Sequence, residues 1–250
     1  MKTLTDLRKN INNGKPSIGT WMQIPSPEIA EILSATKYYD WIVIDMEHGT
    51  FSRSDIASII RAIEIKESLP FVRLQKSNKT SVKNIIDFGF KGFILPMIES
   101  KNQLIEIKNE LLYPPLGKRG VGFSRSNQYG INFEKAIKNN ERPFLVGMIE
   151  TKGGLDNINE ILNTDFLDAI IIGPYDLSAS LGVCGDFESI IFKEAYEFIK
   201  NQCFKKNINF GIHIVEPSNA KLEESIRDGC KFIAYSIDSV ILHSVKPTIN

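Results

Sequence analysis

The chain has 250 residues, of which 42% are hydrophobic and 24% are charged, so it can bury a sizeable core, and this composition argues against disorder. Its 30 basic and 30 acidic residues cancel and no basic run stands out, which argues against nucleic acid or an anionic membrane as a partner and favours a small molecule. We expect a cytoplasmic protein. The polar N-terminus lacks the apolar core of a signal peptide, and no apolar run reaches the ~18 residues of a membrane helix. The three cysteines are scattered and suggest neither disulfides nor a zinc site.

The predicted elements alternate between helix and strand along the chain. Residues 3–13 form a predicted lead-in helix with Leu4, Leu7 and Ile11 on one face. The strands after it are short apolar runs, which is typical of strands buried on both faces. They cover residues 17–23, 40–45, 70–74, 92–96, 144–149, 168–172, 209–214 and 231–236. The predicted helices cover residues 28–35, 54–67, 80–88, 101–112, 133–139, 153–163, 188–206 and 218–228, with a stub of a last helix at 239–245.

This series predicts an α/β fold of the (β/α)8 TIM-barrel type, with a short N-terminal helix and a shortened C-terminal helix. Residues 1–250 are interpreted as one domain, since no Gly/Ser/Pro-rich linker divides them. A doubly wound open sheet is the alternative. Against it, neither GxGxxG nor a P-loop follows the first strand, where a nucleotide-binding sheet usually carries one.

Polar side chains gather where the predicted strands end. They are Asp45, Glu47 and His48 after the second strand, Arg73 at the third, Glu150 at the fifth and Asp176 just past the sixth. In a barrel all of them would face one mouth. Glu150 and Asp176 leave neighbouring strands, and two carboxylates completed by water and substrate oxygens suit Mg²⁺ or Mn²⁺. Taken singly, each acid can equally be a solvated residue or a helix cap.

The remaining candidates differ in what their chemistry allows. An imidazole at His48 can transfer protons near neutral pH, with a nearby carboxylate to fix its tautomer. Arg73 ends a buried strand, where a guanidinium suits a developing enolate or carboxylate oxygen, or else forms an ion pair with a barrel acid. His213 and Glu216, near the seventh strand's end, are predicted to have a rim or structural role, and His243 to lie on the surface.

Several short motifs occur in order between residues 17 and 238. They are Gly19-Thr20-Trp21, Asp45-x-Glu47-His48, Arg73, Leu95-Pro96-Met97, Tyr113-Pro114-Pro115-x-Gly117-x-Arg119-Gly120, Ile149-Glu150-Thr151 and Gly173-Pro174-x-Asp176-Leu177-Ser178. In combination they resemble the metal-dependent 2-keto-3-deoxy acid aldolases, often called HpcH/HpaI aldolases, within the phosphoenolpyruvate-binding barrel superfamily.

The resemblance implies a class II aldol reaction, catalysed by a carbon–carbon lyase of the aldehyde-lyase type. A 2-keto-3-deoxy (4-hydroxy-2-oxo) acid would form from, or be cleaved to, pyruvate and an aldehyde. The implied cofactor is a divalent cation, Mg²⁺, Mn²⁺ or Co²⁺, held by Glu150 and Asp176, without an organic cofactor. Arg73 would stabilise the metal-bound pyruvate enolate, His48 would transfer protons, and Asp45 would support the site.

The resemblance also implies an assembly and a substrate pocket. Asp87 matches an acid that pairs with His48 across a subunit boundary, which implies a homo-oligomer, either a trimer or a hexamer. The residues implied to bind the substrate are Trp21, Arg73, Met148, Gly173, Pro174 and Tyr175.

Three features depart from the family pattern. Met148 stands where the family usually has Gln, which removes an amide from the pyruvate end of the pocket. Tyr175 replaces a small residue and is expected to narrow the mouth or contact the substrate. The chain ends about a dozen residues after Asp238, where relatives continue into a longer helix that is exchanged between subunits, so the usual dimer of trimers is an open question.

Two other readings compete with the aldolase. One is another metal-enolate lyase of the same superfamily that acts on an acyl-CoA thioester, although a neutral chain without a basic stretch gives CoA phosphates little to bind. The other is a catalytically inactive barrel kept for binding. The presence of both metal acids, His48 and Arg73 argues against it.

Overall fold

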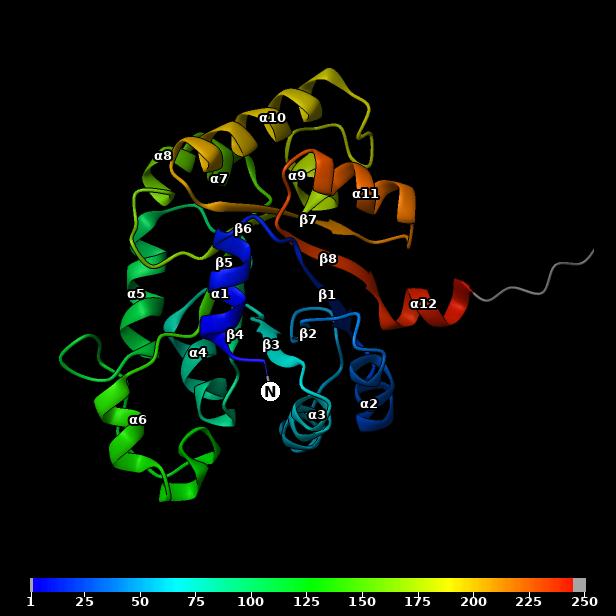
Figure 1. The fold of residues 1–250 in the computed structure, drawn as a ribbon. Helices are drawn as coiled ribbons and strands as arrows, with labels where there is room; N and C mark the ends of the chain where they lie inside the picture. The colour runs from blue at the N-terminus through cyan, green and yellow to red at the C-terminus, as the bar shows by residue number, and fades with distance from the viewer. Residues whose placement is uncertain (1, 245–250) are drawn as a thin grey trace, which may run out of the picture.

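The strands form a closed barrel. In the computed structural model, which describes residues 2–244, eight parallel strands pair in sequence order and β8 closes onto β1 (Figure 1). They are β1 (Ser17–Met22), β2 (Trp41–Asp45), β3 (Leu69–Arg73), β4 (Gly92–Leu95), β5 (Phe144–Ile149), β6 (Ala169–Ile172), β7 (Asn209–Ile214) and β8 (Phe232–Ile237). The predicted TIM-type barrel is confirmed.

Helices surround the barrel between successive strands (Figure 1). They are α1 (Leu4–Asn12), α2 (Pro27–Ala35), α3 (Arg53–Ile65), α4 (Lys79–Ile85), α5 (Lys101–Leu111), α6 (Phe133–Asn139), α7 (Lys152–Asp156), α8 (Ile158–Ile161), α9 (Pro174–Ser180), α10 (Ile190–Lys205), α11 (Asn219–Arg227) and α12 (Asp238–Ser244), with 3-10 turns η1 (Ile86–Phe88) and η2 (Arg125–Gly130). Within residues 2–244, no helix is long and apolar enough to cross a membrane.

The core has two parts, because each strand alternates between the barrel interior and the surrounding helices. The outer part packs Ile, Leu and Val side chains of the strands against the helices. The inner part is aromatic: the rings of Trp41 and Phe232 stack with centroids 4.2 Å apart. The helix α1 completes this inner part, because Leu4, Leu7 and Ile11 belong to the same buried cluster.

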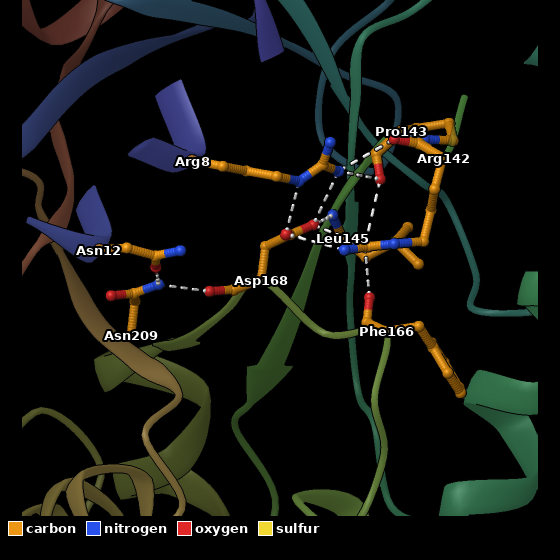
Figure 2. A network of polar contacts seen from close by, with 8 residues as sticks. All are labelled: Arg8, Asn12, Arg142, Pro143, Leu145, Phe166, Asp168 and Asn209. Atoms are coloured by element: carbon orange, nitrogen blue, oxygen red, sulfur yellow. Dashed lines mark hydrogen bonds and ion pairs between the residues drawn. The ribbon is translucent and has the colours of Figure 1, made fainter. Parts of the chain in front are cut away.

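Charged side chains hold α1 against the amino ends of the strands. Figure 2 shows Asp168, directly before β6, between Arg8 of α1 and Arg142, which lies two residues before β5. The Asp168 carboxylate accepts from Arg8 Nε (2.8 Å), from Arg142 Nη1 (2.6 Å) and from the backbone N–H of Leu145 (2.8 Å). The helix α1 therefore covers the amino end of the barrel, opposite the strand ends that carry the predicted site residues.

One predicted helix differs from the structure, and one helix of the structure was not predicted. The helix predicted at 153–163 is wrong as one element, because it breaks at Asn157, whose backbone has φ −98° and ψ 10° and whose side chain donates to the carbonyl of Glu99. The segment after β6 was not predicted as helical, yet α9 begins at Pro174. Proline at the first helical position and Asp176 in the first turn are the helix-start signals that identify it.

The last described helix is α12, at the place of the predicted stub. It begins at Asp238, whose carboxylate accepts from the backbone N–H groups of Gln23 and Ile24, each at 3.0 Å. In Figure 1 α12 projects from the carboxyl end of β8. Val245, the last residue of the predicted stub, lies outside the described residues.

Candidate active site

A buried ion pair stands at the carboxyl ends of β2 and β3. Asp45 and Arg73 are register partners on these neighbouring strands. The Asp45 carboxylate accepts from Arg73 Nε at 2.8 Å and from Nη2 at 2.6 Å. The Asp45 side chain is fully buried and the Arg73 side chain is 8% exposed. A pair with two parallel hydrogen bonds fixes both the position and the plane of the guanidinium.

Asp45 also organises the turn that follows β2. Its carboxylate accepts from the backbone N–H groups of Glu47 (3.1 Å) and His48 (3.3 Å) and from Gln23 Nε2 (3.1 Å). Burial by itself raises the pKa of Asp45, but the hydrogen bonds and charge of Arg73 outweigh it and hold the pKa below its usual value. Asp45 is therefore an ionised anchor for Arg73 and for the His48 turn.

Glu47 and His48 complete this side of the mouth. Glu47 Oε2 lies 3.0 Å from Arg73 Nη1, so two carboxylates share the guanidinium. Burial raises the pKa of Glu47, and Arg73 and His48 partly oppose that rise. His48 itself is exposed, so its imidazole faces the solvent side of the mouth.

Glu150 faces the pair from the carboxyl end of β5. It is only 2% exposed, and its Oε1 accepts from the backbone N–H of Met97 at 2.7 Å. The opposite oxygen lies against Gly173, where an added Cβ would come within 2.4 Å of Oε2, so a side chain at position 173 would collide with the carboxylate. Burial raises the pKa of Glu150 to about 7, and repulsion from Asp176 and Glu47 adds to that rise.

Asp176 supplies the second predicted metal ligand. It lies in the first turn of α9, directly after β6, and its side chain is exposed. Pro174 begins this helix and thereby sets the direction in which Asp176 projects. Asp176 acts electrostatically on both Glu150 and Glu47, so these carboxylates share one region of the mouth.

This donor set fits a divalent cation. The carboxylates of Asp45, Glu47 and Glu150 act on the single guanidinium of Arg73. Asp176 adds a fourth negative charge near Glu47 and Glu150, so negative charge prevails and the buried Glu150 bears the repulsion. Hard divalent ions prefer carboxylate oxygens and commonly complete their shell with water and substrate. Across the part of the chain that the structure describes, no cluster of three or more His, Cys, Asp or Glu side chains forms a ready-made metal cage. A cation held by the two predicted acids, Glu150 and Asp176, would complete its shell with water and substrate oxygens.

The predicted substrate residues have unequal access to the mouth. Tyr175 is 52% exposed and contacts Phe187 edge to face, with ring centroids 5.0 Å apart. Met148 is only 2% exposed and lines the barrel interior beside Gly173. Trp21 is 1% exposed, and Arg73 Cζ lies 4.5 Å from its ring centroid.

The structure does not bring Asp87 to His48 within one chain. Asp87, in η1, is 63% exposed and accepts from Arg119 Nη2 at 3.0 Å. No hydrogen bond between Asp87 and His48 occurs among residues 2–244. The predicted pairing across a subunit boundary therefore stays a prediction.

Two residues of the site were missed in the sequence. Gln23 follows the first strand and donates to Asp45, and the only signal for it is a polar side chain at a strand end. Met97 holds Glu150 through its backbone N–H and has a positive φ of 50°. Met97 belongs to the Leu95-Pro96-Met97 motif, but a backbone contact of this kind leaves no trace in side-chain identity.

Comparisons with known proteins agree on one family. Residues 17–244 match the family described as HpcH/HpaI aldolase/citrate lyase. A 2-keto-3-deoxy-L-rhamnonate aldolase from Klebsiella pneumoniae is 30% identical over 236 residues, which are 94% of this chain and 87% of that protein.

Two solved structures superpose closely. An HpcH/HpaI aldolase/citrate lyase family protein from Burkholderia cenocepacia has a TM-score of 0.89 and 28% identity, with 95% of each chain covered. An HpcH/HpaI aldolase from Desulfitobacterium hafniense has a TM-score of 0.87 and 25% identity, with both chains fully covered.

Proposed function

Because the chain belongs to the HpcH/HpaI aldolase/citrate lyase family, we propose that it is a class II aldolase, a lyase that joins pyruvate to an aldehyde or reverses that reaction. The product or substrate is a 2-keto-3-deoxy (4-hydroxy-2-oxo) acid. The relative named for 2-keto-3-deoxy-L-rhamnonate supports a hydroxylated acid of this class.

One observation carries the proposal: the buried carboxylate of Glu150 and the exposed carboxylate of Asp176 share the barrel mouth with the guanidinium of Arg73. This guanidinium is in turn held by Asp45 and Glu47. Aldol chemistry at pyruvate needs a site for its carboxylate and keto oxygens and a positive group at the oxygen that becomes an enolate. Glu150 and Asp176 would meet the first requirement through a bound cation, and Arg73 would meet the second.

Glu150 and Asp176 would hold the divalent cation, with Mg²⁺ and Mn²⁺ as the leading candidates. When bound, such an ion supplies a Lewis acid that polarises the keto group of pyruvate. The hydrogen bond from Met97 holds one Glu150 oxygen, so the other oxygen, which lies beside Gly173, would be the one to hold the cation.

Arg73 would stabilise the developing oxyanion. Its Nε and its terminal nitrogen Nη2 donate to Asp45, and its other terminal nitrogen, Nη1, forms an ion pair with Glu47. Each terminal nitrogen carries a second N–H, which can donate to a substrate oxygen. Because Asp45 fixes the guanidinium plane before the substrate arrives, this donor needs little reorganisation during the reaction.

His48 would handle the proton. In the cleavage direction, a base removes the proton of the C4 hydroxyl, the C3–C4 bond breaks, and the aldehyde leaves; protonation at C3 then yields pyruvate. An exposed imidazole at the mouth can act in both steps. Asp45 supports this role indirectly, since its carboxylate holds the backbone N–H of His48.

The aldehyde end of the substrate would lie toward Tyr175. A hollow of about 680 Å³ opens there between α9, α10 and α11, with Phe187, Ile212 and Glu216 among its lining residues. Tyr175 stands at its edge and is half exposed, so its ring can contact a substrate chain that extends from the mouth. If Asp87 acts on His48, it does so from a second copy of the chain in a trimer or hexamer.

The direct test is deuterium exchange at the methyl group of pyruvate. Protein loaded with Mg²⁺ or Mn²⁺ is incubated with pyruvate in D₂O, and loss of the methyl proton signal is followed by NMR. We expect exchange in the natural protein and a loss of roughly 100-fold or more in Glu150→Gln or Arg73→Met. Glu106→Gln, on the exposed face of α5, is the matched control. Absence of exchange with every divalent metal tried would refute the pyruvate-enolate reaction.

A further inference from the structure

Three flat groups stack across the upper barrel interior. Arg73 Cζ, from β3, lies 4.5 Å from the ring centroid of Trp21 on β1. The imidazole of His213 on β7 lies 5.1 Å from Trp21, and the two ring planes differ by only 16°. The strands β1 and β7 are not neighbours, since β8 lies between them. The stack therefore joins distant parts of the barrel and ends at the guanidinium of the active site.

The Trp21 ring depends on these contacts for its orientation. Its side chain is 1% exposed, and its Nε1 has no hydrogen-bond partner within residues 2–244. A buried indole normally fixes its ring plane through an N–H donor bond as well as through packing. Here ring contacts have to do so, and His213 and Arg73 supply them.

His213 is itself held by an irregularity in β8. Its Nε2 lies 3.4 Å from the carbonyl oxygen of Ser236, and the hydroxyl of Thr20 donates to the same oxygen at 3.3 Å. Ser236 has a positive φ of 62°, at the point where the pairing of β1 with β8 shifts register. Strained backbone and bulges of this kind collect next to functional sites, where they aim a group that regular pairing would not.

The His213 ring is uncharged. Burial lowers its pKa to about 4, and the positive charge of Arg73 acts in the same direction. A neutral ring can stack in a column that ends in a guanidinium, whereas an imidazolium would be repelled. The geometry thus combines an uncharged aromatic ring, an indole without a hydrogen bond and a catalytic cation.

We propose that His213 is a positioning residue for the aldol reaction: its flat ring holds Trp21, and the Trp21 ring supports the face of the Arg73 guanidinium, whose edge Asp45 binds, where the oxyanion develops. This inference rests on the proposed function, because Arg73 has that task only in an enolate mechanism. The role requires a planar ring at position 213 and not merely a side chain of similar volume.

The requirement for a ring separates this role from simple core filling. His213→Phe keeps a flat ring, whereas His213→Leu keeps bulk without one. We expect kcat for methyl exchange to fall roughly 10- to 100-fold in His213→Leu, since small misplacements of a catalytic group have effects of this size. In His213→Phe we expect kcat to stay within about threefold of the natural protein, and in both variants KM for pyruvate should change less than kcat. His243→Leu, on the exposed side of α12, controls for loss of a histidine elsewhere.

Coupling to Arg73 is tested in a double-mutant cycle. If His213 acts through Arg73, His213→Leu should cause little further loss of kcat in an Arg73→Lys background.

A readout independent of activity is the near-UV circular dichroism of tryptophan. The spectrum should change in His213→Leu and should stay as in the natural protein in His213→Phe.

The outcomes distinguish the two proposals. Two results would overturn the positioning role while leaving the aldolase intact. One is an equal kcat for the His213→Leu and His213→Phe variants. The other is a loss of kcat on His213→Leu that is as large in the Arg73→Lys background as in the natural protein. If the natural protein exchanges no deuterium, the aldolase proposal falls together with the catalytic part of this inference. The near-UV comparison then still decides whether His213 holds Trp21.

Discussion

At the scale of single residues, Met148 sets the polarity of the proposed pyruvate pocket. Its side chain lies in the barrel interior on β5, beside Gly173 and two residues before Glu150. A thioether offers pyruvate oxygens no hydrogen-bond donor, whereas an amide offers two. In the proposed complex, polar recognition of pyruvate would therefore depend on the cation and on Arg73.

Replacing Met148 with glutamine should tighten pyruvate binding. We expect KM for pyruvate to fall roughly 2- to 10-fold in Met148→Gln, the range of one net hydrogen bond. Without pyruvate the buried amide lacks a partner, so the free energy of unfolding should fall by about 1–3 kcal/mol. Steady-state kinetics and urea denaturation measure the two effects. Met148→Leu adds no donor and is the control; an unchanged KM in Met148→Gln would show that pyruvate lies elsewhere.

His213 makes stability depend on pH with a defined sign. Its pKa is about 4 in the folded protein, against about 6.5 in an unfolded chain, so acid protonates the unfolded state first. The stability that neutral His213 contributes is complete above about pH 6.5 and is lost as pH falls toward 4. Of its charged neighbours, Arg73 favours this lowered pKa and Asp45 opposes it.

The measurement compares the natural protein with His213→Phe. Between pH 7 and pH 5, the natural protein should lose about 2 kcal/mol of unfolding free energy beyond what the variant loses. Denaturant titrations at both pH values provide the comparison. Parallel pH curves for the two proteins would mean that His213 is protonated in the fold as readily as in water.

At the scale of elements, α1 covers the amino end of the barrel. Its apolar face packs into the inner core, and the side chain of Arg8 connects it to Asp168 (Figure 2). Arg8 also donates to the backbone carbonyls of Arg142 and Pro143, each at 2.9 Å. One side chain thus connects α1 to the starts of two strands.

Arg8→Ala should loosen α1 without unfolding the barrel. Hydrogen bonds to a charged group contribute about 1.5–3 kcal/mol each, and partial exposure of Arg8 reduces this, so we expect a loss of about 1–2 kcal/mol. Hydrogen exchange of the α1 amides should accelerate, while the amides of β5 and β6 stay protected. Lys9→Ala removes an exposed cation from the same helix and should change neither quantity. Uniform acceleration across the barrel would instead show that α1 unfolds only with the whole protein.

The strands could be predicted from the sequence because both faces of a parallel barrel strand are buried. Such strands read as continuous apolar runs, and β5 and β7 have the predicted bounds, 144–149 and 209–214. The helix at 153–163 could not be predicted as broken, since its break depends on a contact between Asn157 and the distant Glu99. Local periodicity contains no information on such contacts.

The site was predicted as a set of residues but not as a set of contacts. The strand ends identified Asp45, Arg73 and Glu150, because polar side chains there interrupt apolar runs. Which acid pairs with Arg73 depends on the register of β2 against β3. The stack of Trp21 on His213 depends on barrel closure, which brings together strands that are remote in the chain.

At the scale of the whole molecule, charge is balanced overall but not in the mouth. The chain has as many basic as acidic residues, yet the carboxylates of Asp45, Glu47, Glu150 and Asp176 share the carboxyl end of the barrel with the single guanidinium of Arg73. Folding brings these carboxylates together, and their mutual repulsion lowers the free energy of unfolding. A bound cation removes that repulsion only in the folded state and therefore stabilises it.

Divalent metal should consequently raise the stability of the entire barrel. At a concentration about 100 times its dissociation constant, Mg²⁺ or Mn²⁺ should increase the free energy of unfolding by about 2.7 kcal/mol. Thermal unfolding with added metal and with a chelator measures the difference. The increase should disappear in Glu150→Gln and in Asp176→Asn, and it should persist in Glu106→Gln, which removes a carboxylate from the exposed face of α5. An equal increase in all three variants would place the ion outside the mouth, because only there do Glu150 and Asp176 act together.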